Sequence, residues 1–277
     1  HKKNLIFTEK IRSHPGNGEL KIMHLDYKNP VICGKLDKNN SLQQLKGLKK
    51  SIALCLANKF DALITLPIHK KILTTENSKF TGHTEYIANA CNAKGNEVML
   101  LASNQLNVAL ATTHIALKDI PRQITKKSLC HTINTLHDEL KNKFNISQPK
   151  ITVTGLNPHS GEDGEFGDEE IRIIKPAVDK MKGLGISIKG PIPADTAFTP
   201  KLISKTDCFL AMYHDQGLSA FKALTFGKGV NVTLGLPIIR TSVDHGTGLD
   251  IAGSTKIDPS SLFESIKLAI NLVNNQH

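Results

Sequence analysis

The sequence predicts an α/β protein in which mostly parallel sheets are covered by helices on both faces. Short apolar runs with the length of buried strands alternate with longer segments whose apolar residues recur at helical spacing. The 277 residues suffice for one large α/β unit or for two smaller lobes. Polar motifs follow several of the apolar runs, and the loops after strands are where α/β enzymes carry their functional residues.

The first forty residues show no regular pattern. Residues 13–18 form a cluster of turn-forming residues, and the strand patterns beside it are interrupted. The sequence opens on His1 rather than on methionine, so we expect that an N-terminal segment is missing from it. Regular structure begins at Ser41, which we expect to cap a helix whose apolar side chains, from Leu42 to Leu56, face a core.

The rest of the chain contains six predicted strands and three further predicted helices. The strands are expected at 62–65, 98–102, 108–111, 151–154, 208–212 and 230–233, and the helices at 126–144, 168–181 and 259–273. Asp168, Glu169 and Glu170 suit the positive end of the second of these helices. Asp258 is expected to cap the last helix, with Pro259 in its first turn.

The composition favours a globular protein without a membrane or nucleic-acid partner. Apolar residues make up 39% of the chain, no apolar run is long enough to cross a bilayer, and the start of the sequence shows no signal-peptide pattern; we expect a cytoplasmic location. The five scattered cysteines lack a Cys-x-x-Cys pair, which indicates reduced thiols. The net charge of +10 comes from lysines spread along the chain, and aromatics reach only 5%, so we expect a solvated basic surface.

Three histidines stand at the ends of predicted strands. His214, followed by Asp215, comes directly after the apolar run 208–212; His114 closes the run 107–113, and His159 follows 151–158. Burying a polar group without a partner costs about 2–7 kcal/mol, so we expect a metal, a substrate or another charge beside them. Three neutral imidazoles can bind zinc or a related divalent ion and leave one position open. The alternative for each histidine is a hydrogen-bonded core or loop residue.

Two other regions suit the binding of an anion. In the motif 80–85, Gly82 lets backbone approach a ligand, and His83 and Thr84 offer donors for an oxyanion or phosphate; the alternative is a helix cap at Thr81. In the glycine-containing stretch 226–253, Arg240 can bind a carboxylate or phosphate through two hydrogen bonds, although solvated turns are the alternative there. No Gly-x-Gly-x-x-Gly motif is present, so a Rossmann dinucleotide site is not indicated.

Four long motifs together resemble the 4-hydroxythreonine-4-phosphate dehydrogenase (PdxA) family. They are Leu-Asn-Pro-His-Ser-Gly at 156–161, Gly-Pro-Ile-Pro-Ala-Asp-Thr at 190–196, Ala-Met-Tyr-His-Asp-Gln-Gly at 211–217 and Gly-Leu-Pro-Ile-Ile-Arg-Thr-Ser-Val-Asp-His-Gly-Thr at 235–247. The likeness runs from about Ala62 to the C-terminus. The stretch 245–253 is also similar to the nucleotide loop of isocitrate and isopropylmalate dehydrogenases. The resemblance therefore implies their fold, with two α/β lobes and an active-site cleft between them.

The resemblance implies an oxidation of 4-phosphohydroxy-L-threonine that uses NAD or NADP and a divalent metal ion, which would be zinc, magnesium, cobalt or manganese. The product, 2-amino-3-oxo-4-phosphohydroxybutanoate, then loses carbon dioxide to give 3-amino-2-oxopropyl phosphate in pyridoxal phosphate biosynthesis. Carried over by motif, the resemblance implies that the metal ligands are His114, His159 and His214 and that the substrate ligands are His83, Thr84, Lys222, Asn231 and Arg240. The candidates for proton transfer are Lys222 and Asp215. The residues that would bind the cofactor are His245, Gly246, Asp250 and Gly253.

The resemblance also implies a homodimer in which each active site takes one metal-binding histidine from the partner. We expect residues 1–78 and 234–277 to form an outer lobe with the nucleotide loop, and residues 79–233 to form a central lobe with the metal and substrate site. The chain departs from the family in lacking its opening loop of the type Gly-Asp/Glu-Pro-Ala-Gly-Ile-Gly-Pro. It also has Leu66 where many relatives have glycine, and leucine does not readily adopt positive φ.

Three other functions remain open from the residues alone. The nearest is a paralogous dehydrogenase that oxidises 4-phosphoerythronate or 4-phosphothreonate with the same site. An acyltransferase of the phosphate acetyltransferase type is an alternative of another class, and it would not need three histidines around a metal. A basic nucleic-acid-binding protein is the third, and strongly salt-dependent binding would identify it.

Overall fold

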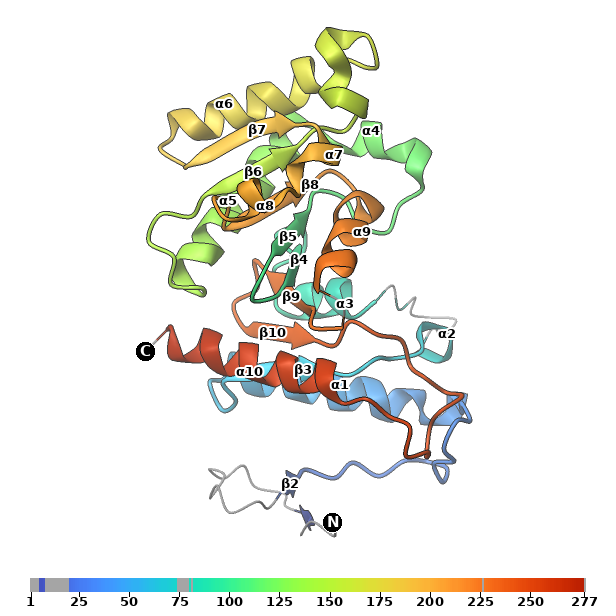
Figure 1. Ribbon diagram of the computed structural model, residues 1–277. Coiled ribbons are helices and arrows are strands. Elements are labelled where there is room, and N and C mark those ends of the chain that lie inside the picture. Colours follow the sequence, from blue (N-terminus) through green and yellow to red (C-terminus); the bar gives the residue numbers. More distant parts are fainter. Residues whose placement is uncertain (1–4, 8–19, 74–79, 81, 226, 277) are drawn as a thin grey trace.

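An eight-stranded mixed sheet with helices on both faces forms the centre of the computed structural model, which describes residues 5–7, 20–73, 80, 82–225 and 227–276 (Figure 1). Across the sheet the strands are β3 (Ala62–Thr65), β10 (Ile239–Ser242), β9 (Val230–Leu234), β4 (Val98–Ala102), β5 (Asn107–Leu110), β8 (Cys208–Ala211), β6 (Ile151–Thr154) and β7 (Ile188–Ile192). Near the N-terminus, β1 (Leu5–Phe7) pairs in parallel with β2 (Leu20–Ile22).

The sheet is less parallel than predicted. Strands β5, β8, β6 and β7 run parallel to one another, and so do β3 and β10, but β9 is antiparallel to both β10 and β4, and β4 is antiparallel to β5. The carboxyl ends of β5, β8 and β6 therefore meet at one edge of the sheet. Those of β3 and β10 point to the opposite edge, so the functional loops do not all share one edge.

The helices divide between the two faces according to the alternation of side chains along the strands. The longer helices are α1 (Ser41–Leu56), α3 (His83–Ala90), α5 (Lys126–Asn142), α6 (Lys175–Gly183), α9 (His214–Thr225) and α10 (Ser260–Asn274). The shorter ones are α2 (Lys70–Leu73), α4 (Ile120–Gln123), α7 (Ala194–Ala197) and α8 (Pro200–Ile203). In β4, Leu100 belongs to the core under α5, α6 and α10, whereas its neighbour Leu101 belongs to the core under α9.

A third core lies where α1 and α3 pack over the β3 end of the sheet. It is built on fully or nearly fully buried side chains, among them Ile52 of α1, Leu63 of β3 and Ile87 of α3. Since α3 falls within 79–233 and α1 within 1–78, this core joins residues of both predicted lobes. The division of the chain into those lobes stays a prediction. Within the described residues, no helix combines the length and apolar character needed to cross a bilayer.

The six predicted strands and the predicted helices are confirmed, with three corrections. Two predicted helix caps are wrong: Ser41 is the first residue of α1, whose cap is Asn40, and the cap of α10 is Pro259 rather than Asp258. The predicted helix 168–181 opens with a π-helical turn, Glu170–Ile174, before α6 begins. Strands β7 and β10 were not predicted, because Gly190 and Pro191 lie in β7 and a charged residue, Arg240, lies in β10; proline is tolerated in β7 because that strand is at the edge of the sheet.

Candidate active site

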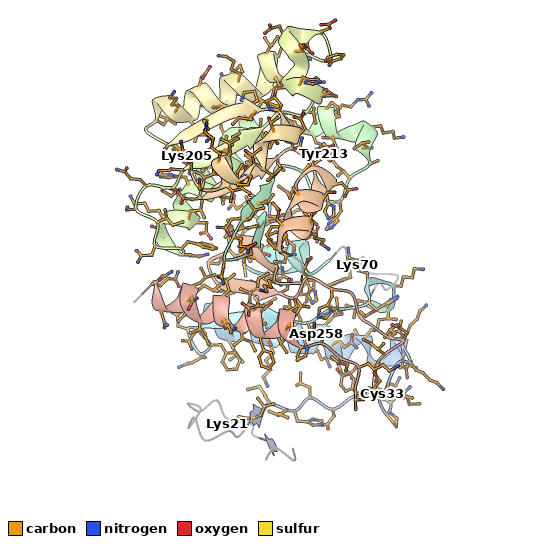
Figure 2. The ribbon with its side chains drawn as sticks, in the orientation of Figure 1. Lys21, Cys33, Lys70, Lys205, Tyr213 and Asp258 are labelled. Carbon is orange, nitrogen blue, oxygen red and sulfur yellow. The ribbon has the colours of Figure 1, made fainter. Side chains whose placement is uncertain are left out.

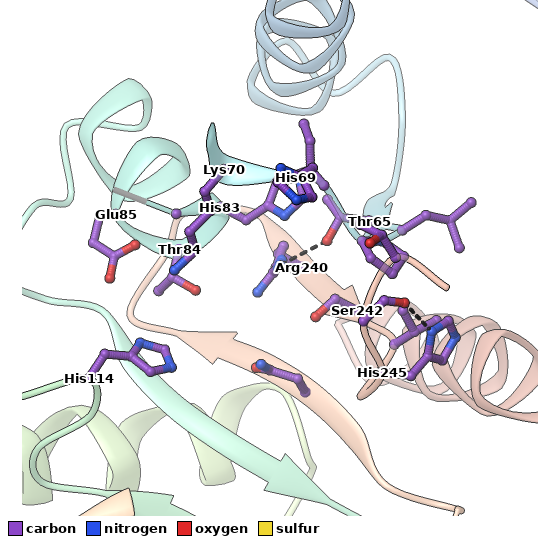
Figure 3. Close-up of a pocket in the computed structure, with 18 of the residues that line it drawn as sticks. Thr65, His69, Lys70, His83, Thr84, Glu85, His114, Arg240, Ser242 and His245 are labelled. Atoms are coloured by element: carbon purple, nitrogen blue, oxygen red, sulfur yellow. Dashed lines mark hydrogen bonds between the residues drawn. The ribbon is translucent and has the colours of Figure 1, made fainter. Parts of the chain in front are cut away.

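A cavity of about 470 Å³ lies over the face of β3, β10 and β9, between α3 and the segments that follow β3, β5 and β10 (Figure 3). Its position on a sheet face differs from the predicted one, since Asn231 and Arg240 project from within strands rather than from loops at their ends. The residues that line it are Thr65, Leu66, Pro67, Ile68, His69, Lys70, Lys71, Gly82, His83, Thr84, Glu85, His114, Asn231, Arg240, Ser242, Val243, His245, Gly246 and Thr247.

Arg240 is the buried cation of the cavity. Only 3% of it is exposed, and its two terminal nitrogens donate to the hydroxyls of Thr233 and Thr65, each at 2.8 Å. Among the described residues, its Nε has no hydrogen-bond partner, and neither has the buried Oδ1 of Asn231. Burial lowers the pKa of Arg240 to about 10, an effect that the nearby Glu85 carboxylate opposes. Because only hydroxyls hold this guanidinium among the described residues, the cavity is suited to an anion.

His83 begins α3 and faces Arg240 in the cavity. Burial lowers the pKa of His83 to about 4, with smaller contributions from Arg240 and Lys70, so its imidazole is neutral at neutral pH. Gly82 precedes it as the N-cap, and the Glu85 carboxylate, the movable end of its side chain, lies 2.6 Å from the place that a Cβ of residue 82 would take. The neutral His83 and the hydroxyl of Thr84 are thus presented to a ligand by the first turn of α3.

His114 and His214 come together at the carboxyl ends of β5 and β8. Their ring centroids are 5.6 Å apart, and Nδ1 of His214 lies 2.7 Å from Oδ1 of Asp215. Partial burial lowers the pKa of His114, as do Lys70 and His214, while Glu85 raises it. A carboxylate on one ring nitrogen leaves the other available to a metal ion, and a neutral imidazole is the ligand form. The pair is therefore chemically suited to a divalent ion.

His159 lies apart from that pair, in the segment Pro158–Gly164. Residues 159–163 all have positive φ, and four of them are not glycine. Holding a non-glycine residue in this left-handed conformation costs about 1–2 kcal/mol relative to the right-handed one, so contacts with the surrounding residues must stabilise the segment. No group of three His, Cys, Asp or Glu side chains in the described part of the chain is arranged to hold a metal ion. One copy of the chain thus brings together two of the three predicted ligands.

Buried Glu170 supports the His159 segment. Its Oε1 accepts hydrogen bonds from the backbone N–H groups of Leu156 and Asn157 at 2.7 and 2.8 Å, and its Oε2 accepts one from the Asn157 amide at 2.9 Å. The sequence suggested for Glu170 only a favourable place near a helix N-terminus. The structure instead makes it the anchor that ties the end of β6 to the π-helical turn.

Of the remaining predicted residues, His245 and Gly246 line the cavity, whereas Lys222, Asp250 and Gly253 are not among its lining residues. Lys222 of α9 has its Nζ 3.5 Å from the Asp244 carboxylate, just before His245. Asp250 is exposed, and Gly253 packs against Cys33, whose Sγ lies 3.4 Å from the place of a Cβ. Figure 2 shows Cys33 and Asp258 in the half of the molecule that ends near Lys21, Tyr213 toward the other end, and Lys70 between them.

Sequence reasoning missed several residues that line the cavity, chiefly Thr65, His69, Lys70, Glu85 and Ser242. The one feature that could have pointed to them is their place in the sequence, since they lie in or beside β3, α3 and β10, and β10 was not predicted. The buried Nδ1 of His69, like Oδ1 of Asn231, has no hydrogen-bond partner in the part of the chain that the structure describes. Leu66 also lines the cavity and is not among the residues with positive φ, so the leucine fits this loop without backbone strain. Thr81 and Phe226 of the two anion-binding motifs lie outside the described residues.

Comparison with known proteins adds three likenesses. The family model of the pyridoxal phosphate biosynthetic protein PdxA matches residues 2–269. The chain is 46% identical over 273 residues to 4-hydroxythreonine-4-phosphate dehydrogenase from Chromobacterium violaceum, covering 98% of this chain and 83% of that protein. It matches the crystal structure of 4-hydroxythreonine-4-phosphate dehydrogenase from Klebsiella pneumoniae with a TM-score of 0.87 and 33% identity, covering 99% and 84% of the two chains.

A more distant likeness confirms the predicted fold. Isocitrate dehydrogenase from Methylococcus capsulatus matches with a TM-score of 0.50 at 13% identity, over 82% of this chain and 71% of that one. At this identity the match speaks for the fold alone.

Proposed function

The chain belongs to the PdxA family of pyridoxal phosphate biosynthetic proteins, and from this premise we propose that it oxidises 4-phosphohydroxy-L-threonine with NAD or NADP. The hydrogen on the carbon that bears the hydroxyl leaves as hydride for the nicotinamide, and the hydroxyl proton passes to a base. The resulting 2-amino-3-oxo acid then loses carbon dioxide to give 3-amino-2-oxopropyl phosphate.

Arg240 is the observation that carries this proposal. A buried guanidinium without a carboxylate partner calls for an anionic ligand, and the substrate supplies both a phosphate and a carboxylate. The unpaired Oδ1 of Asn231 and the neutral His83 lie beside it as further polar partners. Together these groups would hold the substrate in one orientation, which is the main contribution of a binding site to a two-substrate reaction.

We assign the metal site to His114 and His214, with His159 of a second copy of the chain as the third ligand. A divalent ion bound there would lower the pKa of the substrate hydroxyl and stabilise negative charge on that oxygen during decarboxylation. Asp215 orients the His214 ring through Nδ1, which directs the other nitrogen toward the ion. This assignment makes the homodimer part of the active site.

Lys222 is our candidate for the proton transfer. Asp215 is engaged with His214 and its side chain is 84% exposed, so it is the less suitable of the two predicted groups. Lys222 pairs loosely with Asp244, next to His245 and Gly246, where we place the nicotinamide cofactor. We place the enzyme in the cytoplasm, because all five cysteines are free thiols.

The test is the formation of reduced nicotinamide when the protein is supplied with NAD or NADP, a divalent ion and one candidate substrate. Turnover of 4-phosphohydroxy-L-threonine supports the proposal. Turnover of 4-phosphoerythronate or 4-phosphothreonate alone would replace it with the paralogous activity. The family membership already favours a dehydrogenase over the acyltransferase and nucleic-acid alternatives.

A further inference from the structure

We propose that Gln216 is a positioning residue of the metal site. Its side chain is the centre of a hydrogen-bonded brace across the ends of β5, β8 and β6, the three neighbouring strands that precede the metal-binding histidines (Figure 1). The inference rests on the proposed function, which assigns His114, His159 and His214 to the binding of a divalent ion. Gln216 is not among the residues that line the cavity, so it acts on the reaction only through the placement of the histidines.

The side-chain amide of Gln216 forms three short hydrogen bonds. Its Oε1 accepts from the backbone N–H of Met212 and from the hydroxyl of Thr154, and its Nε2 donates to the carbonyl of Gly155, each at 2.7 Å. An amide oxygen has two lone pairs, so both of its acceptor positions are used. Because Met212 follows β8 and Gly155 follows β6, Gln216 fastens the ends of two paired strands to each other.

Thr112 extends this connection to the third strand. Its buried hydroxyl, just after β5, donates to the carbonyl of Met212 at 2.7 Å. The two peptide groups of Met212 are therefore held from opposite sides, one by Thr112 and one by Gln216. The backbone N–H of Ala111 also donates to the carbonyl of Ala211 at 2.8 Å, so β5 and β8 stay paired up to this point. The strand-end brace consists of Thr112, Thr154, Gly155, Met212 and Gln216.

Each metal-binding histidine follows a residue of the strand-end brace after a short piece of chain. The pairs are Thr112 and His114, Met212 and His214, and Gly155 and His159. Two residues of extended chain span at most about 7 Å, so a histidine that close to a fixed point has little freedom of position. In the proposed dimer the first two pairs serve one active site and the third serves the other. The brace of each chain therefore sets the geometry of both sites.

Close packing fixes the backbone from which Gln216 projects. The place of a Cβ at the next residue, Gly217, lies 2.7 Å from Cγ1 of Val108 and 3.0 Å from Cβ of Ala211. Only glycine permits this approach of the first turn of α9 to β5 and β8. The side chain of Gln216 thus starts from a fixed position and carries that position across to β6.

A role as a helix cap does not account for all three bonds of Gln216. Glutamine or glutamate at the third position of a helix commonly accepts a hydrogen bond from the backbone before the helix, as Oε1 does here with the N–H of Met212. The bond from Nε2 to Gly155, by contrast, adds nothing to α9 and requires the amide donor. Glutamine in place of glutamate therefore points to the link with β6.

The test is a titration of the whole chain with Co²⁺, followed through the visible absorption of the bound ion, in the wild type and in Gln216→Leu. Leucine removes all three hydrogen bonds. We expect the affinity for Co²⁺ to fall about 10- to 100-fold, the usual effect of losing a group that orients metal ligands. The absorption spectrum changes too, since it reports the arrangement of the ligands. Gln216→Glu keeps the acceptor for Met212 but loses the donor to Gly155, so its affinity lies between the two.

The matched control is Asn107→Leu. Asn107 joins the opposite ends of β5 and β8 through the same kind of bond, since its Nδ2 donates to the carbonyl of Asp207 at 3.0 Å. This variant should lose stability but keep the Co²⁺ affinity and spectrum of the wild type. If Gln216→Leu does not fold, Thr112→Val takes its place, because it removes only the hydroxyl bond to Met212, and Thr112→Ser should then restore the affinity.

A folded Gln216→Leu, or Thr112→Val in its place, that binds Co²⁺ as tightly as Asn107→Leu and with the same spectrum would overturn the proposal. A wild type that binds no Co²⁺ would refute the metal assignment, and the role of Gln216 would fall with it. The titration needs no substrate. A wild type that binds Co²⁺ but oxidises none of the candidate substrates therefore refutes the proposed reaction alone, and the comparison of affinities still decides the role of Gln216.

Discussion

At the scale of single residues, the buried Arg240 connects the stability of this protein with the binding of its substrate. It is held inside the molecule by two threonine hydroxyls, and no carboxylate among the described residues neutralises it. Removing a charge from water costs several kcal/mol unless it is paired, so the folded chain keeps this arginine at a cost in stability. An anionic ligand recovers that cost, which links stability directly to substrate binding.

Arg240→Met tests this link. We expect the variant to be at least as stable as the wild type, by about 0–2 kcal/mol, because the unpaired buried charge is gone. Its KM for the phosphorylated substrate rises by about 100-fold, since a charge-assisted double hydrogen bond is lost. Thermal unfolding with and without inorganic phosphate is the measurement, and phosphate should raise the Tm of the wild type alone.

The control for this variant is Arg172→Met, which removes an exposed arginine paired with Asp168 on the surface. We expect it to change neither KM nor the response to phosphate. A clear fall in the Tm of Arg240→Met would contradict the account, because it would show that Arg240 is needed for folding rather than for a ligand.

At the scale of elements, the end of β6 and the turn after it depend on one buried acid. Glu170 accepts the N–H groups of Leu156 and Asn157, and it thereby fixes the left-handed segment that carries His159. Gln216 acts in a similar way between neighbouring strands, since it bonds to Thr154, Gly155 and Met212. These polar crosslinks hold the ends of β6 and β8 in register.

Glu170→Ala tests the first of these crosslinks. It leaves two buried N–H groups without partners, so we expect the free energy of unfolding to fall by about 2–4 kcal/mol. Chemical denaturation measures the loss, and hydrogen exchange at Leu156 and Asn157 reports whether the segment is released. Glu170→Gln keeps an acceptor oxygen and should lose less. Unchanged stability of Glu170→Ala would contradict the role assigned to Glu170.

The predictability of the elements follows from their chemistry. Strands of uninterrupted apolar residues, such as β4 and β8, were predicted within a residue or two. Strand β7 was missed because Gly190 and Pro191 are typical of loops, and β10 because Arg240 reads as a solvated residue. The antiparallel placement of β9 and β4 depends on long-range pairing, which no local pattern encodes.

The residues of the candidate site, like the strands, could be predicted only in part. The resemblance led to His83, Thr84, His114, Asn231, Arg240, His245 and Gly246, all of which line the cavity. Glu85 and His69 were not singled out, because a lone acid in a first helical turn and a lone histidine carry no pattern. Their surroundings become informative only once the strands and helices are assembled.

At the scale of the whole molecule, one chain supplies two of the three proposed metal ligands. If the third comes from a second copy, two different inactive variants can restore one working site in a mixed dimer. We expect His114→Ala and His159→Ala each to be inactive and each to remain folded. After the two are unfolded and refolded together, about one quarter of the wild-type activity should return, because half of the dimers are mixed and each of these has one intact site.

The control for the mixed dimer is His114→Ala with His214→Ala, which we assign to the same chain's half of the site. This mixture should stay inactive, since no combination of the two restores an intact pair. Activity from this mixture, or none from the first, would contradict the proposed sharing.

The most direct test of the central claim is a stoichiometry. The protein is given 4-phosphohydroxy-L-threonine, NAD or NADP and a divalent ion, and reduced nicotinamide and carbon dioxide are measured in the same reaction. The account predicts equal amounts of the two, each equal to the substrate consumed. Oxidation only of substrates that lack the amine, or no reduced nicotinamide at all, would contradict it.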